Sequence, residues 1–82
     1  MKLQTGFLPI EPLREWLDAY TARTGRTEDE IAFDLGVPSR VLFRWRREVK
    51  GVRLESIDRA FTYFGEPYLL EELWPLEEGM PA

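Results

Sequence analysis

The chain has 82 residues, 44% of them hydrophobic, and a formal net charge of −4. A chain of this length can bury one small core, so we expect a single domain. It contains no cysteine and no histidine. This composition excludes disulfide frameworks, thiolate or imidazole zinc sites, and catalysis built on those side chains. We therefore expect no enzyme activity, no metal site and no cofactor.

The first ten residues lack helical periodicity and contain Gly6 and Pro9. We predict an irregular N-terminal arm over residues 1–10. The apolar part of this arm is too short for a signal peptide, and no apolar run in the chain has the length needed to span a bilayer. A soluble, cytoplasmic protein without a membrane partner is the expectation.

A first helix is predicted from about Pro12, because proline suits the first turn of a helix. Its apolar positions recur with helical spacing at Leu13, Trp16, Leu17 and Tyr20. This helix is expected to end near Thr24 and Gly25 and to pack that apolar face, including both aromatic rings, into the core.

A second helix begins after Thr27, which forms a capping box with Glu30 three residues later. Carboxylates at 28, 29 and 30 lie in its first turn, where the helix dipole favours negative charge. A paired-carboxylate active site is the alternative, but hydrolases of that type need two carboxylates across a cleft and no partner group is identifiable nearby. The structural role is favoured.

Gly36 can take the left-handed conformation that ends the second helix. Pro38 suits the first turn of a third helix, and Ser39 can cap its free amides. The third helix then has two faces. Its apolar stripe comprises Pro38, Leu42, Trp45 and Val49. Its opposite face comprises Arg40, Phe43, Arg44 and Arg47.

Two interpretations of that arginine-rich face remain open. Guanidinium groups fit guanine edges and phosphates, as a helix that enters the DNA major groove requires. Arginine is also a good helix former, and such charges are often only solvated. The charge distribution favours a docking surface: residues 40–53 carry six positive charges and one negative, whereas the flanking segments are both net acidic.

The segment 48–53 can form a plain loop or a very short hairpin, a wing, around Lys50 and Gly51, and the loop is favoured at this length. A fourth helix follows and stops at Gly65. Its apolar positions are Leu54, Ile57, Phe61 and Phe64.

A short fifth helix is predicted from Glu66 and Pro67 to Trp74, ended by Pro75, with a frayed tail over residues 75–82. This end has more apolar residues than one face of a two-turn helix normally carries: Tyr68, Leu69, Leu70, Leu73, Trp74 and Leu76. Either they close the core over the first and fourth helices or part of them forms a subunit contact. We predict a homodimer formed at least partly through this C-terminal segment.

The order of these elements resembles the lambda-repressor-like (Cro-type) helix-turn-helix family. Three stretches carry the resemblance, which covers residues 12–65: LREWLDAYTARTG, EIAFDLGVPSRVLFRW and LESIDRAFTYFG. The resemblance implies an all-α domain of four to five short helices, here expected over residues 11–74, with the third helix in the major groove.

The resemblance also implies which residues touch DNA. The base-facing positions are Ser39, Arg40, Val41 and Arg44, with Val41 near enough to meet a thymine methyl group. This chain departs from the family where Glu28 replaces a phosphate-binding glutamine, and where Arg46 and Arg47 follow the tryptophan. Phosphate contacts are therefore expected from Arg46, Arg47, Lys50 and Arg53.

The expected function is sequence-specific binding of double-stranded DNA by a bacterial or bacteriophage transcriptional regulator, such as a repressor. Because one such domain contacts few base pairs, a homodimer on a two-fold operator or a partner protein is expected. Two alternatives remain. One is an excisionase-type recombination accessory protein, which a real hairpin at residues 48–53 would favour. The other is a protein–protein interaction module, which the acidic total and Glu28 favour.

Overall fold

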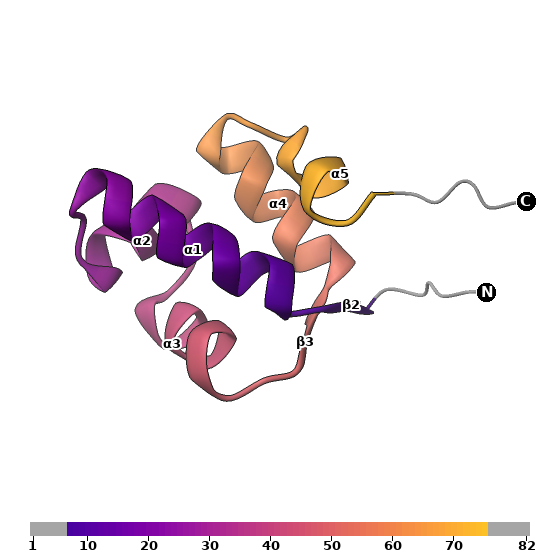
Figure 1. The fold of residues 1–82 in the computed structure, drawn as a ribbon, viewed down its shortest axis with the longest axis horizontal. Coiled ribbons are helices and arrows are strands. Elements are labelled where there is room, and N and C mark those ends of the chain that lie inside the picture. The colour runs from indigo at the N-terminus through magenta and orange to yellow at the C-terminus, as the bar shows by residue number, and fades with distance from the viewer. Residues whose placement is uncertain (1–6, 76–82) are drawn as a thin grey trace, which may run out of the picture.

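The computed structural model of the protein describes residues 7–75. In chain order, its elements are β2 (Phe7–Pro9), α1 (Glu11–Thr24), α2 (Glu28–Leu35), α3 (Ser39–Arg47), β3 (Gly51–Arg53), α4 (Leu54–Phe64) and α5 (Leu69–Leu73). The described part is thus mostly helical, as the sequence predicts, with a small two-stranded sheet added (Figure 1). None of its helices has both the length and the apolar character needed to cross a membrane.

The helix ends follow the local sequence signals closely. The Thr27 hydroxyl accepts from the Glu30 amide (3.2 Å), and the Glu30 carboxylate accepts from the Thr27 amide (2.9 Å), so the predicted capping box is confirmed. Gly36 ends α2 with a φ of 70°. The Tyr63 ring lies so close that a Cβ on Gly36 would approach it to 2.7 Å. Both the conformation and the space therefore require glycine here.

The start of α3 differs from the prediction. Pro38 is the N-cap residue, with a ψ of 148°, and Ser39 is the first helical residue. No side chain caps the helix, because the N-cap residue is a proline; the Ser39 hydroxyl, one residue later, donates to Asp29 Oδ1 (2.8 Å). The predicted capping role of Ser39 is wrong. Its side chain ties α3 to the acidic first turn of α2.

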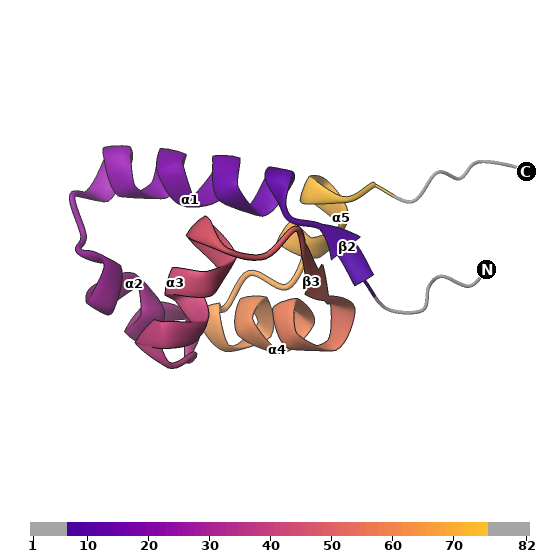
Figure 2. The same cartoon turned by 90° about the horizontal axis from the view of Figure 1, so that it is seen from below.

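The core lies between α1, which runs along one side of the molecule, and the helices beneath it (Figure 2). Every element from α1 to α5 contributes to it. Its buried members are Ile10, Leu13, Leu17, Tyr20, Ile31, Ala32, Leu35, Leu42, Trp45, Val52, Ile57, Ala60, Phe61 and Leu69. Trp16 stacks on Tyr20 and meets Phe61 edge to face. The predicted apolar faces are confirmed except at their starts, where Pro38 and Leu54 are exposed.

Two segments predicted to be irregular pair with each other. β2 and β3 are antiparallel, with Leu8 opposite Val52, and the Ile10 amide donates to the Lys50 carbonyl (3.0 Å). Within residues 7–10 the predicted irregular arm is therefore wrong, and Ile10 is completely buried. Residues 1–6 of that arm lie outside the described residues.

Segment 48–53 is neither the plain loop nor the local hairpin that the sequence offered. Its strand β3 pairs with β2, which precedes α1 at the start of the described chain. The close approach needs a small residue, because a Cβ on Gly51 would lie 3.1 Å from the Leu8 carbonyl oxygen. A local wing, the feature that would favour an excisionase, does not form at residues 48–53.

The C-terminal apolar residues pack inside the chain. α5 begins at Leu69, later than predicted, because residues 67–68 form a turn. Leu69 is buried, while Leu70, Leu73 and Trp74 pack half-buried against the core. The indole N–H of Trp74 donates to the Pro9 carbonyl (2.8 Å). Of the two roles considered for this segment, α5 fills the one that closes the core over α1 and α4; Leu76 and the tail beyond Pro75 lie outside the described residues.

Candidate nucleic-acid interface

The orientation of α3 is fixed by Arg14 of α1. Its Nε donates to the Trp45 carbonyl (2.8 Å) and its Nη2 to the Val49 carbonyl (2.7 Å). Carbonyls at a helix C-terminus lack intrahelical partners, and a cation there is also favoured by the helix dipole. Together with the buried side chains of Leu42 and Trp45, this contact determines which face of α3 points outward.

The outward face of α3 carries the residues that its periodicity predicts: Arg40, Phe43, Arg44 and Arg47 are all exposed. The Arg47 guanidinium lies over the Phe43 ring, 4.6 Å from its centroid. Phe43 carries no predicted contact role. The sequence could have indicated such a role, because Phe43 lies three residues from Arg40 and four from Arg47. This spacing puts the three side chains on one helix face. Phe43 lies at the middle of the exposed surface.

Two of the predicted phosphate-contacting arginines already have carboxylate partners. Arg46 lies 2.9 Å from Asp18 and 3.5 Å from Glu28, nitrogen to oxygen, and its side chain is only 20% exposed. Arg47 lies 2.9 Å from Glu28. Arg46 thus faces α1 and α2, and the structure does not bring it to the outward face. The same contacts neutralise Glu28, whose charge would otherwise oppose a phosphate.

The remaining predicted cations have no ion-pair partner within residues 7–75: Arg40, Arg44, Lys50 and Arg53. Arg53 lies over the Phe7 ring, 5.7 Å from its centroid. Paired and unpaired charges are therefore separated across α3. Carboxylates neutralise its α1–α2 side, whereas the side toward β3 and α4 keeps its positive charge.

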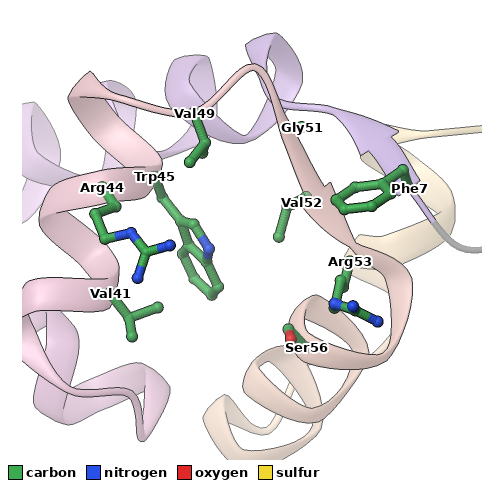
Figure 3. Close-up of a pocket in the computed structure, with 9 residues that line it drawn as sticks. All are labelled: Phe7, Val41, Arg44, Trp45, Val49, Gly51, Val52, Arg53 and Ser56. Carbon is green, nitrogen blue, oxygen red and sulfur yellow. The ribbon is translucent and has the colours of Figure 1, made fainter.

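A pocket of about 300 Å³ lies on that positive side, between α3, β3 and the start of α4 (Figure 3). Its lining comprises Phe7, Val41, Arg44, Trp45, Val49, Gly51, Val52, Arg53 and Ser56. Val41, predicted to face a base, is half-buried and lines this pocket on the flank of α3. The structure brings Arg44 and Arg53 to one pocket although the sequence assigns them different contacts.

A scan against protein-family models finds no match for the chain. Searches of curated proteins and of solved structures find no significant match either. The functional argument therefore depends on where the charged, aromatic and apolar side chains of α3 and β3 lie.

Proposed function

We propose that this protein binds double-stranded DNA sequence-specifically, with α3 in the major groove, and acts as a transcriptional regulator. The observation that carries the proposal is the exposed arginine-rich face of α3, held outward by the core and by Arg14. An α-helix fits the major groove, and guanidinium groups match the O6 and N7 acceptors of guanine. In this proposal α2, the turn through Gly36 and α3 form a lambda-repressor-like helix-turn-helix.

The charge distribution supports the same surface. The whole chain carries −4, yet Arg40, Arg44, Lys50 and Arg53 are unpaired within residues 7–75. A positive patch on an acidic protein attracts a polyanion to one side and repels it elsewhere. DNA would thus meet the outward and β3-facing sides of α3 first.

The contacts divide into reading and anchoring. Arg40, near the start of the outward face, is the proposed guanine reader, and the exposed Phe43 is the proposed contact for a thymine methyl group. Lys50 and Arg53, beyond the end of α3, are proposed phosphate contacts that fix register without specifying sequence. Ser39 already donates to Asp29, so a contact from it to DNA requires that bond to break.

The test begins with selection of binding sites from a random duplex pool. Arg40→Ala is expected to cost about 1–3 kcal/mol on the selected site and to relax the preference at one base position. Arg23→Ala removes the same charge from an exposed position on α1 and serves as the control. A folded Arg40→Ala protein with unchanged site preference would show that α3 does not read bases through Arg40.

A protein-interaction module is the second candidate, favoured by the carboxylates of Asp18, Glu28 and Asp29 beside α3. These groups reduce the positive charge that α3 presents to DNA and would suit a partner with both charge signs. The random-pool experiment separates the candidates. If no duplex is enriched or retained at low salt, the DNA proposal fails and the module remains.

A further inference from the structure

The indole N–H of Trp45 makes no hydrogen bond to the protein within residues 7–75. Trp45 as a whole is only 6% exposed. The comparable N–H of Trp74 donates to the Pro9 carbonyl. Polar groups in largely buried side chains usually have a partner in the protein or in water. The Trp45 ring lines the pocket between α3, β3 and α4 (Figure 3), so a ligand there can supply the acceptor.

The other polar side chains of that pocket are also donors. Arg44 and Arg53 bring two guanidinium groups, Ser56 brings a hydroxyl, and no carboxylate lines the space. A second pocket, of about 210 Å³, differs in charge. It is lined by Asp18 as well as by Arg46, and these two residues already form an ion pair. Donors and positive charge without a counter-charge select an acceptor that is negative, which is an oxyanion.

The size and the walls of the pocket suit one phosphodiester group. Its volume is about 300 Å³, and Val41, Val49 and Val52 give it apolar walls against which deoxyribose carbons can pack. We propose that the pocket seats a single backbone phosphate of the DNA, with Trp45 Nε1–H donating to a phosphate oxygen and Arg44 and Arg53 flanking it. This inference rests on the proposed function.

One consequence is a changed role for Arg44. The family resemblance makes it a base reader, whereas the pocket makes it an anchoring residue beside Arg53. Base reading by α3 then depends on Arg40 and Phe43, which are exposed and do not line the pocket. The two roles differ measurably, because loss of an anchor weakens all sequences alike.

Nuclear magnetic resonance of the indole N–H groups tests the proposed phosphate contact directly. Trp45→Phe identifies the Trp45 signal and leaves those of Trp16 and Trp74. Adding the duplex selected from the random pool should shift the Trp45 signal and leave the Trp74 signal in place. The same duplex can be prepared as a series in which each member carries one neutral methylphosphonate linkage at a different position. One member of the series should still bind the protein but no longer shift the Trp45 signal. A titration with inorganic phosphate alone tests whether the pocket binds a free anion.

Charge removal gives the second readout. Arg44→Ala and Arg53→Ala should each weaken binding to selected and unrelated duplexes alike and lower the slope of log affinity against log salt by about one unit. Arg23→Ala, with the same charge change on α1, should leave both quantities unchanged. Because these variants alter exposed side chains, their folding can be checked independently by thermal denaturation.

Three results would overturn the inference. If Arg44→Ala changes the preference at one base position while the Trp45 signal ignores the duplex, Arg44 reads a base and only the proposed function survives. If inorganic phosphate shifts the Trp45 signal but the duplex does not, the pocket is a free-anion site. If no duplex is selected or bound, the inference and the proposed function fail together.

Discussion

At the scale of single residues, Glu28 determines how much positive charge α3 presents. One of its carboxylate oxygens lies 2.9 Å from Arg47 Nη1 and 3.5 Å from Arg46 Nε. Arg46 also pairs with Asp18 and stays turned toward α1 and α2, whereas Arg47 is exposed and must share its guanidinium between Glu28 and any phosphate. The acidic start of α2 therefore acts as an internal competitor for DNA, in addition to its favourable position at the helix N-terminus.

Glu28→Gln is accordingly expected to strengthen binding to all duplexes and to raise the salt slope by about one unit, because Arg47 gains a phosphate contact. The measurement is a set of binding isotherms across salt concentrations. Glu15→Gln, an exposed carboxylate on α1 without an ion pair in the described part, is the control. Equal affinities and slopes for the variant and the wild type would contradict a competing role for Glu28.

Tyr20 couples stability to alkaline pH. Its hydroxyl donates to Asp34 Oδ2 (3.0 Å). Burial raises the pKa of Tyr20 above its ordinary value of 10.0, and the hydrogen bond to Asp34 raises it further. Because the folded-state pKa is the higher one, the contribution to stability is fully present below about pH 10 and is lost as pH rises through the folded-state pKa.

The corresponding prediction compares Tyr20→Phe with the wild type by denaturant unfolding at a series of pH values. The difference in the free energy of unfolding should be constant near neutral pH and should change above about pH 10 in the direction that removes the wild-type advantage. If the free energies of unfolding of the two proteins keep a constant difference above about pH 10, ionisation of the Tyr20 hydroxyl does not affect stability.

At the scale of elements, one cation of α1 joins that helix to the C-terminal end of α3. Arg14 bonds two carbonyls at the C-terminal end of α3. Its half-buried side chain therefore links the longest helix to the proposed reading helix. No other α1 side chain in the described residues donates to an α3 carbonyl.

Arg14→Ala should lower the free energy of unfolding by about 1–3 kcal/mol, because two partly buried carbonyls lose a charged donor. Amide hydrogen exchange should accelerate most in the last turn of α3, residues 44–47. Arg23→Ala on the same helix is the matched control for charge and helix propensity. Uniform acceleration across all helices would mean that Arg14 contributes only to global stability.

At the scale of the whole molecule, the apolar C-terminal residues are already used within one chain. Leu69, Leu70, Leu73 and Trp74 pack against the core, and Tyr68 is the exposed large hydrophobic residue of that segment, at 55%. The homodimer predicted from the sequence stays a prediction, because one domain contacts few base pairs. Among the described residues of this segment, Tyr68 is the apolar side chain available for a C-terminal contact between protomers.

We expect little self-association without DNA and two protomers on a duplex with two-fold symmetry. Sedimentation velocity with duplexes that carry one or two half-sites measures the stoichiometry. Tyr68→Glu should reduce cooperative loading of the second protomer if the C-terminal segment forms the contact. Saturation of a two-fold duplex by a single protomer would contradict the predicted homodimer.

The sequence alone determined the features that depend on neighbours within about one helical turn. The capping box at Thr27 and Glu30 and the left-handed end of α2 at Gly36 are local geometry. The outward and inward faces of α3 follow from a period of 3.6 residues. These features are confirmed because tertiary packing selects among local preferences that already agree with it.

Tertiary structure alone decided the features that join distant segments. β2 pairs with β3, from which it is separated in the sequence by three helices. Two strands of three residues each are too short to show a periodic pattern in the sequence. The partners of the arginines were equally hidden. Arg46 and Arg47 turn toward Asp18 and Glu28, whereas Arg44 lines the pocket beside Trp45. Helical spacing fixes the direction in which a side chain leaves its helix, but only the packing of α1, α2 and β3 around α3 determines which charge it meets.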